Sequence, residues 1–68
     1  MITNIYIILK EGDRFTLLGK EVESYKERES LRVIQFMKDN NAFVIPFESI
    51  LYIQKEIKWI ILEKRLQE

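Results

Sequence analysis

The chain has 68 residues, a length that fits one small domain spanning residues 1–68. It contains neither Cys nor His, which excludes disulfides, zinc sites built on those residues and catalytic Ser-His or Cys-His pairs. Eleven acidic residues balance eleven basic ones, and a net charge of zero argues against a strong binder of phosphate backbones. Ile, Leu, Val and Phe supply 25 residues, which excludes a disordered tail.

The first part of the chain is typical of a β-hairpin. Residues 2–10 are rich in β-branched and aromatic side chains and predict a strand. Glu11-Gly12-Asp13 is a turn signal, and residues 14–22 are expected to form the returning strand. Gly19 interrupts this second strand, and a glycine in such a place often marks a bulge or a sharp bend.

The stretch 20–32 differs from its neighbours because eight of its thirteen residues are charged. It predicts either a solvated loop or a short exposed helix, with the charges forming a solvated face. A competing interpretation joins residues 21–38 into one helix that is capped by Asn40 and has apolar positions at 22, 25, 33, 36 and 37.

The following stretch predicts further strands joined by tight connections. An Asn-Asn pair at 40–41 suits a tight hairpin turn, because Asn tolerates a positive φ. Pro46 cannot donate to a β-ladder and therefore lies at an edge or a strand end. The expected elements are a strand within 31–38, a strand at 42–45, one turn at 47–49 and a strand at 50–54.

The C-terminal piece, residues 55–68, fits two structures. As a strand it places Ile57, Trp59 and Ile61 on one face, whereas as a helix it aligns Ile57, Ile60 and Ile61. The β-branched and aromatic residues from 57 to 61 favour the strand, and a last helical turn toward Leu66 stays open.

These elements predict a mainly β fold: a small, strongly bent sheet or open barrel of five to six strands, with at most one short helix. The alternative is an α+β fold with a helix at about 21–38. Leu9-Lys10-Glu11-Gly12 resembles the first turn of Sm-like proteins, and Ile45-Pro46-Phe47-Glu48-Ser49-Ile50 resembles the one-turn connection into a final barrel strand. The resemblance to SH3-like and Sm-like barrels covers about residues 5–54 and implies the fold alone, so no binding residues are carried over.

Several expected strands have two apolar faces. In the first, Ile5, Ile7 and Leu9 face one way while Tyr6 and Ile8 face the other. Such strands are normally covered on both sides, and a chain this short has few elements with which to cover them. We therefore expect a homo-oligomer or a complex with a larger protein, and the alternative is a tightly curled monomeric barrel.

The function indicated is non-catalytic, with no cofactor and no metal. The two glycines form neither a P-loop nor a dinucleotide fingerprint, and the isolated Asp residues form no calcium loop. An aromatic and apolar stretch flanked by lysines has the composition of a protein interface. The expected interface residues are Tyr52, Ile57, Trp59 and Ile61.

The alternative function is a small β-barrel that binds single-stranded RNA or DNA. Such barrels combine basic side chains with aromatic stacking platforms. The candidate basic residues are Lys10, Arg14 and Lys20, although the neighbouring acids Glu11 and Asp13 cancel much of their field.

No apolar run approaches the roughly 20 residues of a membrane helix, and the N-terminus lacks the pattern of a signal peptide. These features predict a cytoplasmic protein that does not enter a membrane. A small interaction or regulatory module of this kind would suit a phage or mobile element, in which it would cover a surface of a host protein.

Overall fold

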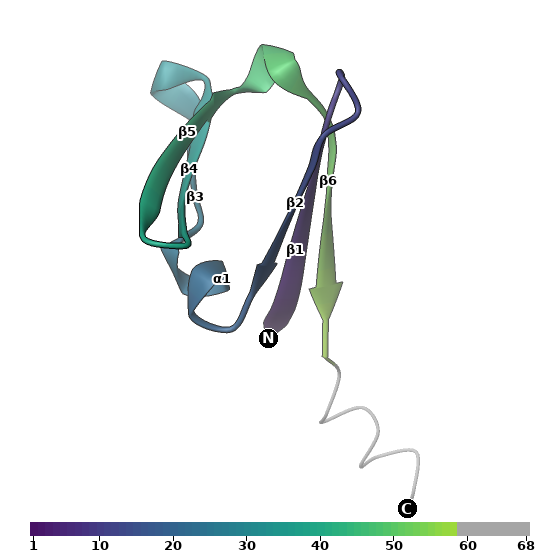
Figure 1. Ribbon diagram of the computed structural model, residues 1–68, viewed down its shortest axis with the longest axis vertical. Coiled ribbons are helices and arrows are strands. Elements are labelled where there is room, and N and C mark those ends of the chain that lie inside the picture. The colour runs from purple at the N-terminus through teal and green to yellow at the C-terminus, as the bar shows by residue number, and fades with distance from the viewer. Residues whose placement is uncertain (59–68) are drawn as a thin grey trace, which may run out of the picture.

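A computed structural model describes residues 1–58 of the chain as two antiparallel three-stranded sheets with short connections (Figure 1). The expectation of a small, mainly β fold is confirmed, with six strands and one short helix where the sequence predicted five to six strands and at most one short helix. The strand order is β2-β1-β6 in the first sheet and β3-β4-β5 in the second. In chain order, the elements are β1 (Ile2–Leu9), β2 (Arg14–Leu18), α1 (Lys20–Ser24), β3 (Lys26–Arg28), the 3-10 turn η1 (Glu29–Leu31), β4 (Val33–Lys38), β5 (Asn41–Pro46), the 3-10 turn η2 (Phe47–Ser49) and β6 (Ile50–Ile57).

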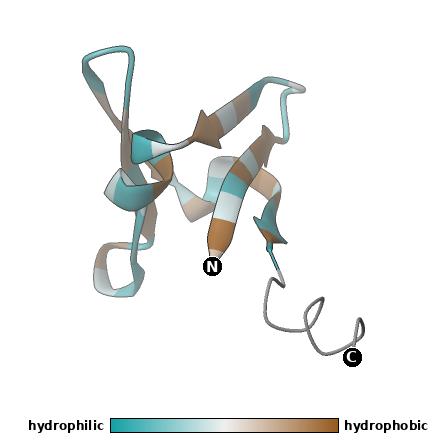
Figure 2. Cartoon of the chain, turned by 90° about the horizontal axis from the view of Figure 1, so that it is seen from below, coloured by the Kyte–Doolittle hydropathy of each residue, from teal (hydrophilic) through white to brown (hydrophobic). Residues whose placement is uncertain are grey.

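The first sheet forms around β1, which pairs with β2 on one side and β6 on the other. Alternate residues of a strand point to opposite faces, so Ile5 and Ile7 enter the core together with Leu17 from β2. Tyr6 and Ile8 point to the outer face, as their positions in the sequence predict, and are only partly buried. Figure 2 shows apolar residues along several of the strands, whereas the short strand β3 consists of charged residues.

The second sheet contributes Ile34, Phe36 and Ile45 to the same core. Its β4–β5 hairpin turns at Asp39 and Asn40, whose φ angles are 52° and 64°. Two consecutive positive φ values match the primed turn that suits the twist of a two-residue hairpin. The sequence placed this turn at residues 40–41, one position late, because Asn41 is already the first residue of β5.

Three aromatic rings join the two sheets. Phe15 of β2 packs against both Phe36 and Phe43 of the second sheet, with centroid distances of 5.2 and 5.1 Å, and the rings of Phe36 and Phe43 are stacked 5.2 Å apart. Aromatic pairs at such distances stabilise a core beyond the area that they bury. The rings therefore fix how the sheets face one another.

The prediction of a strand at 14–22 is wrong beyond Leu18. Gly19 adopts a φ of 55° and turns the chain, after which α1 begins at Lys20. The alternative of one helix over 21–38 is also wrong, because residues 33–38 form β4 in the middle of the second sheet. Ile34 and Phe36 lie two residues apart, so a strand points both into the core, where they are buried.

At the C-terminal side, β6 runs through residues 50–57 and so extends three residues beyond the strand that the sequence predicts at 50–54. Ile57 is its last residue. Trp59, Ile60, Ile61 and the suggested turn toward Leu66 lie outside the described residues. No helix among residues 1–58 is long and apolar enough to cross a membrane.

Candidate protein-interaction surface on β6

β6 is an edge strand of the first sheet. Within residues 1–58 it forms a β-ladder with β1 alone, so one of its two sides carries unpaired backbone groups. None of its eight residues is buried, in contrast to the central strand β1. An exposed strand edge of this length is a template for pairing with another chain.

The register identifies the backbone groups on the free side. The Leu9 N–H donates to Asp13 O and the Leu9 carbonyl accepts from the Gly12 N–H, so Leu9 directs its backbone toward β2. Because this direction alternates along a strand, Tyr6 and Ile8 direct theirs toward β6. Their partners, Gln54 and Tyr52, therefore turn their backbone groups toward β1. It follows that the N–H and C=O groups of Ile53 and Lys55 point to the free side, in the regular part of the ladder between its two register shifts, one of which falls at Leu51.

Large apolar side chains accompany this edge. Leu51 is 61 % exposed, Tyr52 52 % and Ile57 45 %. Two of the four predicted interface residues, Tyr52 and Ile57, thus lie exposed on β6, whereas Trp59 and Ile61 lie outside the described residues. We call the free edge of β6 together with Leu51, Tyr52 and Ile57 the β6 surface. Its role in binding stays a prediction.

The outer face of the first sheet continues this surface across three strands. Residues opposite one another in an antiparallel pair share a face, so the register defines cross-strand rows. The face is mixed, with an aromatic or aliphatic side chain in each row. The three rows are Arg14–Ile8–Tyr52, Thr16–Tyr6–Gln54 and Leu18–Asn4–Glu56.

A hydrogen-bond network ties β6 to β1 on this outer face. Oε1 of Glu56 accepts from the Tyr6 hydroxyl at 2.7 Å and from Nδ2 of Asn4 at 2.5 Å. The bond from Tyr6 is the main reason that the pKa of Glu56 lies below its usual value, and it raises the pKa of Tyr6 in turn. Oε2 of Glu56 accepts no hydrogen bond from residues 1–58, so this carboxylate retains a free acceptor.

On the inner face, a second cluster joins β6 to the opposite sheet. Nζ of Lys55 lies 3.0 Å from Oε2 of Glu27 in β3 and 5.4 Å from the centre of the Tyr25 ring. The Tyr25 hydroxyl donates to the same carboxylate oxygen at 2.8 Å. Burial, followed by this bond to Glu27, raises the pKa of Tyr25. The cluster turns Lys55 inward, away from the free edge.

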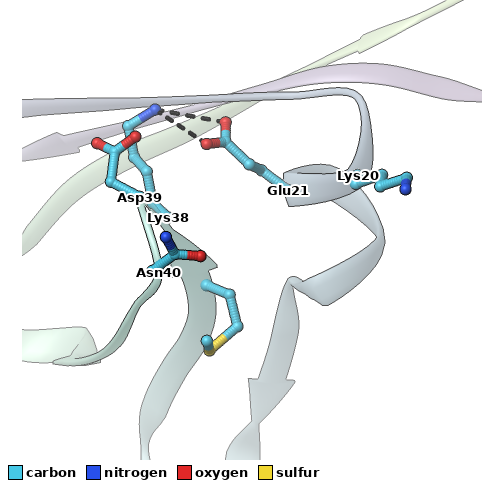
Figure 3. A pocket seen from close by; sticks show the side chains of 6 residues that line it. Lys20, Glu21, Lys38, Asp39 and Asn40 are labelled. Atoms are coloured by element: carbon cyan, nitrogen blue, oxygen red, sulfur yellow. Dashed lines mark hydrogen bonds and ion pairs between the residues drawn. The ribbon is translucent and has the colours of Figure 1, made fainter.

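Charged side chains line one of the hollows on the surface of residues 1–58. The one in Figure 3 has a volume of about 220 Å³ and lies between α1 and the β4–β5 turn. Two of its charged groups form an ion pair, with Nζ of Lys38 3.3 Å from Oε1 of Glu21. The Leu18 backbone N–H and then Lys38 hold the pKa of Glu21 below its usual value. Among residues 1–58, no group of three or more acidic side chains is placed to hold a metal ion.

The predicted nucleic-acid residues do not gather in one place. Arg14 begins β2 and shares a row with Tyr52, while Lys10 is exposed in the adjoining turn. Lys20 lies in α1, beyond the other end of β2, because Gly19 ends the strand before it. One basic side chain and one exposed aromatic ring therefore share the outer face.

Sequence reasoning missed the two polar clusters of β6. The partners of Glu56 lie about 50 residues away along the chain, and Glu27 lies 28 residues from Lys55. Only the pairing register brings them together, and no local pattern of residues encodes it. No known protein family, curated protein or solved structure matches the chain. The arrangement of side chains and backbone groups is therefore the basis for a functional proposal.

Proposed function

We propose that this chain is a non-catalytic protein-interaction module that binds through the β6 surface. One observation carries the proposal: an eight-residue edge strand has one unpaired side within residues 1–58 and no buried residue, and it bears large exposed apolar side chains. Backbone pairing supplies affinity in β-strand addition, while alternate side chains supply specificity. A regulatory role in the cytoplasm, including that of a phage or mobile-element protein that covers a host protein, extends this proposal.

The chemistry of the rest of the molecule supports a binding role. The described residues carry neither a metal cluster nor an unpaired buried side-chain group that a reaction could use. The ionisable groups with shifted pKa values are engaged in ion pairs and hydrogen bonds that join secondary-structure elements. Exposed apolar side chains beside a free edge are, in contrast, a feature of surfaces that meet other chains.

The test compares a β6 variant with a matched control. Leu51→Lys combined with Tyr52→Lys places charge on the β6 surface, whereas Val44→Lys places it on β5, at a residue that is 57 % exposed. Sedimentation velocity and affinity capture would measure binding, and circular dichroism would verify folding. We expect the wild-type chain to bind itself or another protein, the double variant to lose that binding and Val44→Lys to retain it.

Two results would contradict the proposal. If the double variant binds as well as the wild-type chain, the β6 surface is not the binding site. If the wild-type chain binds no protein but binds a single-stranded oligonucleotide with an affinity that falls steeply with salt, the nucleic-acid alternative replaces it. Arg14→Glu would then weaken oligonucleotide binding, because Arg14 shares an outer-face row with Tyr52.

A further inference from the structure

Resting on the proposed function, the geometry points to a second copy of this chain as the partner of the β6 surface. We propose that two β6 strands pair antiparallel across a two-fold axis at Gln54. The three strands β2-β1-β6 of each copy would then form one continuous six-stranded sheet. Closed two-fold dimers are the commonest assemblies of identical chains, and such an interface must be complementary to itself.

The charge pattern of β6 selects the register. With Gln54 opposite Gln54 of the second copy, Ile53 faces Lys55 and Tyr52 faces Glu56. Sliding the pair toward the C-terminus sets Lys55 against Lys55 or Glu56 against Glu56, and like charges directly opposite one another are destabilising. The proposed register contains no such pair.

Sliding the pair toward the N-terminus is disfavoured for a different reason. A two-fold axis at Ile53 would place Glu56 opposite Ile50 and would leave Ile57 beyond the paired residues. The axis at Gln54 instead sets Leu51 opposite Ile57. These two side chains are among the exposed apolar groups of the chain, so this register covers them with each other.

The free acceptor on Glu56 supports the same register. Both hydrogen bonds that this carboxylate accepts within residues 1–58 go to Oε1. Tyr52 and Glu56 turn their own backbone groups toward β1, so across the dimer they form a non-hydrogen-bonded pair, in which Cα atoms approach to about 4.5 Å. Such an approach lets the Tyr52 hydroxyl donate to Oε2 of Glu56 on the second copy. The two-fold axis forms this contact twice.

The positive charge of Lys55 on β6 does not prevent this pairing. An unpaired lysine on an edge strand opposes the addition of another strand, since its charge would lose water. Lys55 already pairs with Glu27 at 3.0 Å within its own copy. A strand added beyond β6 therefore does not leave the Lys55 charge without a partner. The net charge of zero also removes long-range electrostatic repulsion between two copies.

The dimer is expected to be weak and dependent on concentration. One strand pair lies at the small end of stable protein interfaces, which bury roughly 1,200–2,000 Å². Sedimentation equilibrium from about 10 µM to about 1 mM, the range of transient contacts, would follow the monomer–dimer equilibrium of the full chain. We expect the mass to rise toward that of a dimer and no further.

Single cysteines test the position of the axis, because the natural chain has none. Gln54→Cys places two thiols opposite one another at a separation that suits a disulfide. Leu18→Cys is the control, an exposed position on the outer face of the other edge strand, β2. With oxidised glutathione as the oxidant, two protein thiols give one disulfide and two reduced glutathione molecules. We expect Gln54→Cys to cross-link on the order of ten times faster, since the dimer raises its effective concentration.

A mixing experiment tests the register itself. In the proposed dimer, residue 52 of one copy faces residue 56 of the other. Neither residue 52 nor residue 56 faces the same residue of the second copy. An equimolar mixture of Tyr52→Cys and Glu56→Cys, with one variant carrying a mass tag, should yield mainly the mixed disulfide. Predominant Tyr52→Cys or Glu56→Cys homodimers in mass spectrometry would overturn this register.

The remaining outcomes separate the inference from the proposed function. A monomer at every concentration overturns the self-pairing, while binding of another protein that Leu51→Lys with Tyr52→Lys abolishes would leave the proposed function in place. A mass that exceeds the dimer indicates a head-to-tail contact of β6 with another surface and overturns the two-fold axis. A dimer that survives the double variant, with equal cross-linking of Gln54→Cys and Leu18→Cys, contradicts both proposals.

Discussion

The ammonium group of Lys55 lies 3.0 Å from a carboxylate oxygen of Glu27, and this ion pair joins β6 of the first sheet to β3 of the second. The Tyr25 hydroxyl donates to the same oxygen at 2.8 Å. The core between the sheets is apolar, so this cluster adds a polar and directional contact between them. Such a contact makes the stability of the fold depend on pH.

We expect Glu27→Gln to reduce the loss of unfolding free energy that the chain shows as the pH falls into the acid range. The hydrogen bond from Tyr25 and then the one from Lys55 lower the pKa of Glu27 in the folded chain. A carboxyl group whose folded pKa is depressed stabilises the fold above its unfolded pKa and loses that contribution as pH falls through the folded pKa. Urea unfolding between about pH 5 and about pH 3 should therefore show a smaller loss of unfolding free energy in the variant.

The control for this prediction is Glu29→Gln, because the Glu29 carboxylate makes no hydrogen bond or ion pair with residues 1–58. It should follow the wild-type profile. At neutral pH, Glu27→Gln should cost no more than about 1 kcal/mol, since both partners of the ion pair are partly exposed to solvent. A variant that keeps the full acid limb would show that other carboxyl groups, such as Glu21 and Glu56, carry the pH dependence.

The core could be predicted from local pattern, and a mutation at Ile7 tests it. Ile7 is fully buried, and Ile7→Val should lower the free energy of unfolding by about 1 kcal/mol because it leaves a methyl-sized cavity. Val44→Ala, on an exposed side chain of β5, should change it by less than about 0.5 kcal/mol. Chemical denaturation of both variants provides the measurement, and equal losses would contradict the assigned faces.

The elements that the sequence predicts well have strong local signals. Residues 2–10 are rich in β-branched and aromatic side chains and end at a turn signal, and this local pattern indicates a strand. Residues 20–32 lack such a pattern. Their short helix α1 depends on contacts with residues far along the chain, such as the bond from the Met37 N–H to Ser24 Oγ.

Part of the candidate site could likewise be predicted from the sequence, and part could not. Exposed apolar residues such as Tyr52 and Ile57 could be proposed from composition, since interfaces favour such side chains. The free edge of β6 could not, because an edge is defined by strand order, and strand order follows from long-range pairing of β1 with both β2 and β6. Among the candidate basic residues, Arg14 lies in β2 but Lys20 does not, because the chain turns at Gly19.

A backbone position after η1 offers a stabilising substitution. Arg32 adopts the left-handed conformation, with φ 55° and ψ 46°, and its side chain is exposed. A residue with a Cβ atom pays roughly 1–2 kcal/mol there, which glycine avoids at a smaller entropic cost. Arg32→Gly should therefore raise the free energy of unfolding by up to about 1 kcal/mol. Lys26→Gly, in extended β3, should lower it, and a loss of stability in Arg32→Gly would show that the arginine side chain matters more than its backbone angle.

Ser24 is expected to hold α1 against the second sheet. Its Oγ accepts a hydrogen bond from the Met37 N–H at 2.9 Å and donates one to the Glu21 carbonyl at 2.6 Å. Ser24→Ala should lower the free energy of unfolding by about 1 kcal/mol. The larger penalty of a buried donor without a partner does not apply, because Met37 is exposed and water can bind its N–H group in the variant. The control is Ser30→Ala, in the exposed turn η1, which should stay within about 0.5 kcal/mol of wild type. Amide exchange would locate the effect: faster exchange at Met37 alone supports the proposed bond, whereas unchanged exchange at Met37 contradicts it.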